Sequence, residues 1–72
     1  SPMISKGCLV QYCPVVDGPG SGPFLLVLSD IYEKSVVNMR FDSGYESLQV
    51  VDIFDDDGTI RTYQVDALEK VQ

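Results

Sequence analysis

The chain has no histidine and no tryptophan, and only two of its 72 residues are cysteines. Without histidine, the ordinary Cys/His zinc sites cannot form within the chain, and a serine or cysteine nucleophile has no imidazole base. No run approaches the ~20 apolar residues of a membrane-spanning helix, and no signal peptide opens the sequence. We therefore expect no enzyme activity, no bound metal and no cofactor.

The length is enough for a single domain over residues 1–72, because so short a chain buries only about 60 % of its unfolded surface. Stability is then marginal, and oligomerisation is the supplement that this composition leaves open. Ser1 and Pro2 are interpreted as a remnant of an expression vector, with Met3 as the expected native start.

The two cysteines predict the redox setting. Cys8 and Cys13 lie five residues apart in what we expect to be one strand. An odd separation places them on opposite faces, where a disulfide cannot form. Two small buried thiols are typical of a reduced, cytoplasmic protein.

The net charge of −6 is unevenly distributed. Residues 1–41 are neutral in sum, so the whole excess of acid lies in residues 42–72. A surface of this sign repels a phosphate backbone, which disfavours nucleic acid and favours a protein partner with a basic surface.

The C-terminal third predicts a β-hairpin. Two apolar, β-branched runs flank residues 55–58, where Gly58 can supply the positive φ of a tight turn. In the first strand we expect Val51 and Ile53 to point inward and Phe54 to be half exposed, because Asp52 on a buried face is costly without a partner. In strand 59–65 the pattern does not decide which face is buried.

Upstream of the hairpin the sequence predicts three strands and a long loop. The expected strands are residues 7–13, with Cys8, Val10 and Tyr12 on one face, residues 24–32, buried on both faces or bent between two sheets, and residues 35–41. Three Gly and three Pro predict an irregular loop over 14–23. Turns are expected at Glu33-Lys34 and at residues 42–44.

After the hairpin, residues 66–68 predict one 3₁₀ turn capped by Asp66, which places Leu68 in the core before a short strand over 69–71. The predicted fold is therefore all-β, with five to six short antiparallel strands and one 3₁₀ turn before the last strand. Turns every 8–12 residues are typical of a small barrel or sandwich.

Several core and turn positions carry a family resemblance. They are Gly7-x-Leu9-Val10, Val27-Leu28, Val51-x-Ile53, Asp57-Gly58 and Leu68-Glu69-x-Val71. This skeleton resembles that of small SH3-like and KOW-like barrels, including short proteins of bacteriophages and their hosts. The resemblance implies an SH3-like barrel, but the aromatic motif and paired tryptophans of peptide-binding SH3 domains are missing, so no proline-peptide groove is expected.

The acidic turn does not fit a calcium loop. If Gly58 is taken as the invariant glycine of an EF-hand, the first ligand falls on Ile53 and the twelfth on Gln64. We interpret Asp55, Asp56 and Asp57 as a solvated turn, because Asp tolerates turn geometry.

The main functional hypothesis is a non-enzymatic module that binds a protein partner or associates with itself, and the family resemblance implies a phage origin. It would use an exposed strand edge or a face carrying Tyr45, Phe54 and Tyr63, with Asp55, Asp56 and Asp57 beside it.

Two alternatives stay open. The first is an acidic decoy that occupies the nucleic-acid site of a host enzyme. Its phosphate stand-ins would be Asp42, Glu46, Asp52, Asp55, Asp56, Asp57, Asp66 and Glu69. The second alternative is a single-strand binder that stacks bases on Tyr12, Tyr32, Tyr45 and Tyr63.

Overall fold

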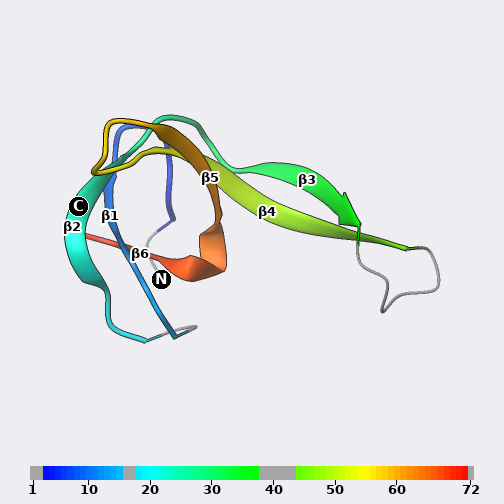
Figure 1. Ribbon diagram of the computed structural model, residues 1–72, viewed down its shortest axis with the longest axis horizontal. Coiled ribbons are helices and arrows are strands. Elements are labelled where there is room, and N and C mark those ends of the chain that lie inside the picture. Colours follow the sequence, from blue (N-terminus) through cyan, green and yellow to red (C-terminus); the bar gives the residue numbers. More distant parts are fainter. Residues whose placement is uncertain (1–2, 16–17, 38–43, 72) are drawn as a thin grey trace.

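The computed structural model describes residues 3–15, 18–37 and 44–71. These residues form six strands and one 3₁₀ turn, and no α-helix (Figure 1). The strands are β1 Leu9–Tyr12, β2 Ser21–Val27, β3 Tyr32–Val37, β4 Tyr45–Phe54, β5 Ile60–Gln64 and β6 Leu68–Lys70, with the 3₁₀ turn η1 at Val65–Ala67. Within the described ranges there is no helix of the length and apolar character that crossing a membrane requires.

All strand pairings are antiparallel and follow the order β3-β4-β2-β1-β6, with β5 also paired to β4. The predicted all-β class, with a 3₁₀ turn before the last strand, is confirmed. The described pairings form an open path that does not return on itself, so the closed barrel is not confirmed. β4 is the strand with the most partners, since it pairs with β2, β3 and β5 along its ten residues.

The core lies inside the curved part of the sheet. Its fully buried side chains are Val10, Val27, Val51 and Ile53, contributed by β1, β2 and β4. Val51 and Ile53 point inward and Phe54 is 47 % exposed, as the hairpin pattern predicts. The hairpin itself is confirmed by the Asp55 amide, which donates to the Thr59 carbonyl over 2.8 Å, and by Gly58 at φ 84°.

The structure shows which face of β5 is buried, and it differs from the predicted bounds and cap of the 3₁₀ turn. Tyr63 and Val65 pack against the core, while Ile60 points outward. Leu68 enters the core as predicted. The 3₁₀ turn begins one residue earlier than expected, and Gln64 precedes it without any side-chain cap, so the capping role of Asp66 was wrong.

The N-terminal half departs most from the predicted boundaries. β2 begins at Ser21, inside the expected loop, and only its Leu25 and Val27 are buried, so the expected burial on both faces was wrong. The run over 24–32 is interrupted at Ser29 and Asp30, whose side chains bind backbone amides of segments distant in sequence. The Ser29 hydroxyl accepts the Asp52 amide over 3.0 Å, and Asp30 accepts the Lys6 amide over 3.1 Å.

One predicted turn and one predicted burial pattern were also wrong. Glu33 and Lys34 lie within β3 and do not form a turn. Tyr12 is exposed whereas Cys13 is buried, because the register of β1 against β2 shifts between Val10 and Tyr12 and breaks the expected alternation. The predicted strand beyond residue 37, and residues 42 and 43 of the next turn, lie outside the described residues.

β3 and residues 45–49 of β4 form a two-stranded ribbon that extends away from the curved part of the sheet (Figure 1). We call this ribbon the arm. Its projection makes the molecule long, with extents of 38 × 23 × 23 Å. None of the arm residues is buried, in contrast to the inner positions of the same strand further on.

Candidate interaction surface

The acidic turn is folded back on itself. Asp55 is only 8 % exposed and is the one buried charged residue in the described ranges. Its Oδ2 accepts the Tyr63 hydroxyl over 2.6 Å and Arg61 Nη1 over 3.1 Å, and its Oδ1 accepts the Asp56 amide over 2.9 Å. Arg61 Nη2 also lies 2.8 Å from Asp57 Oδ2. The predicted solvated turn holds for Asp56 and Asp57, which are exposed, but it was wrong for Asp55, which is buried and bound to Arg61 and Tyr63.

These contacts form a network that shifts the proton affinities of its members. The hydrogen bond from Tyr63, followed by that from the Asp56 amide, holds the pKa of Asp55 below its usual value of 3.8. The bonds from Arg61 and then Thr59 lower the pKa of Asp57. The Asp55 carboxylate raises the pKa of the Tyr63 hydroxyl, because it stabilises the protonated phenol.

The carboxylates of Asp55, Asp56 and Asp57 each place an oxygen within 4.8 Å of the others. Such spacing could suit a cation. However, Asp55 and Asp57 already share Arg61, and Asp57 also accepts the Thr59 hydroxyl over 2.6 Å. A cation here would compete with the Arg61 guanidinium, which contacts two of the three carboxylates. We therefore interpret the three carboxylates as groups that stabilise the turn.

The structure does not place Tyr45, Phe54 and Tyr63 on one face. Phe54 lies opposite Ile60 on the outside of the sheet, whereas Tyr63 lies opposite Val51 and packs on the core. Tyr45 lies in the arm, at the other end of β4. The three residues were assigned to one surface because strand parity alone cannot show where a strand leaves the body of the molecule.

The tyrosines likewise occupy different environments. Tyr12 and Tyr63 contact each other with ring centroids 6.2 Å apart and tilted by 51°. The Tyr32 hydroxyl donates to Asp52 Oδ1 over 2.7 Å. Tyr45 lies opposite Val37, at the other end of the arm from Tyr32. The described structure thus offers one tyrosine pair and no row of stacked rings.

A different apolar surface emerges from the strand register. Leu9 lies opposite Leu26, Leu26 opposite Phe54, and Phe54 opposite Ile60, so one row crosses four strands. Phe24 lies two residues from Leu26 on the same face of β2. We call these five residues the outer apolar row. They point away from the core, and the exposed fractions are 59 % for Phe24, 40 % for Leu26 and 66 % for Ile60.

Sequence reasoning missed this row, although it predicted a half-exposed Phe54. The apolar run over 24–32 predicts a strand buried on both faces or bent between two sheets, and no local pattern shows that Leu26 is adjacent to Phe54. Only the pairing of β2 with β4 brings these side chains together. The Cβ atoms of directly opposite residues are typically about 4.5–5.5 Å apart.

Acidic groups border the outer apolar row. Asp52 lies on the same face of β4, two residues before Phe54, and the acidic turn follows Phe54 directly. On the other side, Glu69 lies opposite Gln11, which shares the face of Leu9. The described part of this surface therefore has an apolar centre with carboxylates at its margins.

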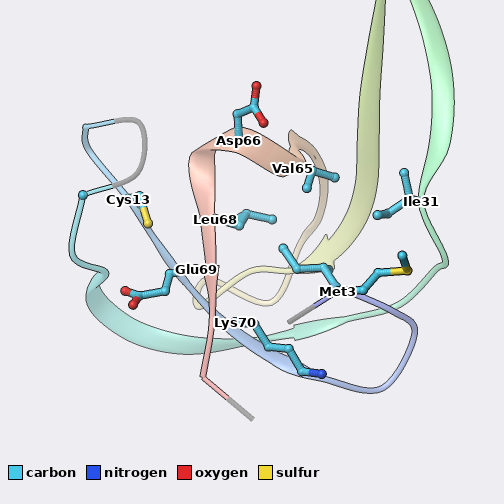
Figure 2. Close-up of a pocket in the computed structure, with 10 residues that line it drawn as sticks. Met3, Cys13, Ile31, Val65, Asp66, Leu68, Glu69 and Lys70 are labelled. Atoms are coloured by element: carbon cyan, nitrogen blue, oxygen red, sulfur yellow. The ribbon is translucent and has the colours of Figure 1, made fainter. Parts of the chain in front are cut away.

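A separate hollow of about 540 Å³ opens where the core reaches the surface beside η1 and β6. In Figure 2, Leu68, Val65, Ile31 and Met3 surround the central space, while the carboxylate of Asp66 points away from it. Glu69 also extends to one side, and its carboxylate accepts the Gly20 amide. The hollow is thus lined by apolar side chains together with the charged residues Asp66, Glu69 and Lys70, but these charged groups do not converge on one point as they do in most small-molecule sites.

Comparison with known proteins adds no identification: no family model matches the chain, and no curated protein or solved structure matches it. The resemblance to SH3-like barrels therefore stays a prediction.

Proposed function

We propose that this chain is a non-enzymatic interaction module that binds a protein partner through the outer apolar row. The observation that carries the proposal is the row's continuity over four strands, with two phenylalanines among its five members. Scattered apolar side chains are ordinary on protein surfaces, but a contiguous patch with polar margins is typical of a binding site.

The chemistry of the row fits a protein surface. Aromatic residues such as Phe24 and Phe54 supply large contact areas with little loss of side-chain freedom, and they are enriched at the centres of interfaces. Their rigid β-strand positions hold them in place before binding. A complementary partner would present aliphatic or aromatic side chains to the row.

The charge at the margins specifies the partner further. The marginal carboxylates that form no ion pair among the described residues, those of Asp52, Asp56 and Glu69, would face the rim of the partner, so lysine or arginine is favoured there. A second copy seated on the same face would bring acidic margins together in a molecule of net charge −6. The proposed occupant of the outer apolar row is therefore a different protein with an apolar centre and a basic rim.

The acidic-decoy alternative has less support. A decoy needs its carboxylates available along one face, but several of the predicted stand-ins are used within the molecule. Asp52 accepts hydroxyl groups from Tyr32 and Thr62, Asp55 and Asp57 bind Arg61, and Glu69 accepts the Gly20 amide. Asp42 lies outside the described residues.

Stacking of nucleic-acid bases has still less support. It requires open aromatic faces along a positively charged groove. Here Tyr63 packs on the core and against Tyr12, and the net charge opposes a phosphate backbone. A cytoplasmic location is part of the proposal, supported by Cys8 and Cys13, which are both buried and are not in a disulfide.

Selection from a random peptide library displayed on phage tests the proposed function. We expect the selected peptides to combine aromatic or aliphatic residues with Lys or Arg. Replacing Phe54 and Ile60 together with alanine should weaken their affinity by about tenfold or more, the scale of interface hot spots. Isothermal titration calorimetry of synthetic peptides measures this.

The matched control is Val37→Ala, which removes an equally exposed apolar group from the arm. It should leave peptide affinity unchanged. Acidic peptides from the selection, or equal binding by the wild type and the Phe54→Ala/Ile60→Ala variant, would contradict the proposed function.

A further inference from the structure

The second surface of interest is the outer edge of β3. In the described sheet, β3 is the end strand of the pairing path and its only partner is β4. An unpaired edge is a template for another strand, and natural sheets usually shorten, cover or bend such edges. β3 is six residues long and lies in the arm, where the body of the molecule does not cover it (Figure 1).

The pairing identifies which backbone groups face outward. β5 pairs with one edge of β4, and both β2 and β3 pair with the other edge. The Asp52 carbonyl accepts the Leu28 amide over 2.8 Å, so the N–H and C=O groups of the even-numbered residues of β4 point towards β2 and β3. Lys34 pairs with Leu48, so the even-numbered groups of β3 point inward to β4. Hydrogen-bonding direction alternates along a strand. The N–H and C=O groups of Glu33, Ser35 and Val37 therefore point outward.

The arm also lacks a core of its own. None of its described residues is buried, and Val37 is 69 % exposed. A two-stranded ribbon is at best marginally stable in water, whereas three or more strands stabilise one another. Additional strands paired with β3 would thus stabilise the arm, which buries none of its described residues in the single chain.

We propose that two copies of this chain pair antiparallel through their β3 edges, with a two-fold axis at Ser35. The two arms then form one four-stranded sheet in the order β4-β3-β3-β4. This association goes beyond the proposed function, because it uses another surface and leaves the outer apolar row available to a different protein.

The sequence of β3 is self-complementary in this register. Ser35 of one copy lies opposite Ser35 of the other, Lys34 opposite Val36, and Glu33 opposite Val37. No two like charges are directly opposed, an arrangement that would be destabilising. A symmetric interface of this kind needs the same surface on both subunits, and an antiparallel strand edge meets that requirement.

Charge also favours a second copy at this edge. β3 is neutral, since Glu33 and Lys34 balance, although the whole chain carries −6. Ser35 pairs with Ser47, and Asp55, the first residue after β4, lies eight residues beyond Ser47, which corresponds to about 26 Å of extended strand. Pairing through β3 thus holds the two acidic turns well apart.

Sedimentation equilibrium over a concentration series tests the proposal. The wild type should show a monomer–dimer equilibrium. Ser35→Glu should weaken dimerisation about fivefold or more, because it opposes two carboxylates across the axis. The matched control is Ser47→Glu, which adds the same charge on the same rung but one strand away from the axis, and should change the dissociation constant less than about twofold.

A mixing experiment separates the proposal from loss of folding. Ser35→Lys alone should also dimerise weakly, but an equimolar mixture of Ser35→Lys and Ser35→Glu should form a heterodimer at least as tightly as the wild type. A wild type that stays monomeric at millimolar concentration, or dimerisation that Ser47→Glu weakens as much as Ser35→Glu, would overturn it. The Phe54→Ala/Ile60→Ala variant should still dimerise, so failure here leaves the proposed function standing.

Discussion

Replacing Ile53 with alanine is expected to lower the free energy of unfolding by about 2–4 kcal/mol, the range for large-to-small substitutions in a packed core. Ile53 is fully buried in β4 and packs with the core side chains of β1 and β2. Domains of this size have little stability to spare. The variant should therefore be largely unfolded at temperatures where the wild type is folded.

Urea unfolding followed by circular dichroism measures this difference. Ile60→Ala is the matched control, because Ile60 is an isoleucine of the same hairpin that points outward and is mostly exposed. Its unfolding free energy should change by no more than about 0.5 kcal/mol. Equal losses for the two variants would contradict the assignment of inner and outer faces.

Stability is also expected to fall steeply in acid. Asp55 and Asp57 have lower pKa values in the folded chain than the usual 3.8. Their contribution is therefore fully present above about pH 4 and is lost as the pH falls through the folded-state values, because the unfolded chain binds the protons first. Tyr63 acts in the opposite sense, with a raised pKa, so its contribution is lost in strong alkali.

Thermal unfolding at a series of pH values between neutral and pH 2 measures the acid limb. Asp55→Asn should lower the melting temperature at neutral pH and flatten its fall in acid, since the variant has one fewer carboxylate to protonate. Asp66→Asn is the control, because Asp66 is exposed on η1 and is not part of the network. An unchanged acid limb in Asp55→Asn would show that the network does not govern stability.

The parts of the fold that depend on neighbouring residues could be predicted from the sequence. Gly58 between two β-branched runs indicated the hairpin, and the pairing of Val51 with Ile53 on one face identified the core of β4. Leu68 after a short turn was also predicted correctly. In each case the local pattern and the burial in the folded chain agree.

The remaining errors have physical causes that lie outside any local pattern. Alternation could not orient β5, because both of its faces mix polar and apolar residues, and the bond from Tyr63 to Asp55 depends on the folded turn. Asp55 was expected in solvent, but Arg61 and Tyr63 lower the cost of burying it. The outer apolar row depends on pairings between strands that are distant in sequence, as Leu26 and Phe54 are.

The most direct test of the central claim is a nuclear magnetic resonance titration of the isotope-labelled chain with one of the selected basic, apolar peptides. Binding at the outer apolar row predicts that the largest shifts fall on Leu9, Phe24, Leu26, Phe54 and Ile60, with smaller shifts on Asp52 and Glu69. The arm and the hollow beside η1 should change little. Shifts confined to the arm or to the hollow, with the outer apolar row unaffected, would contradict the proposed function.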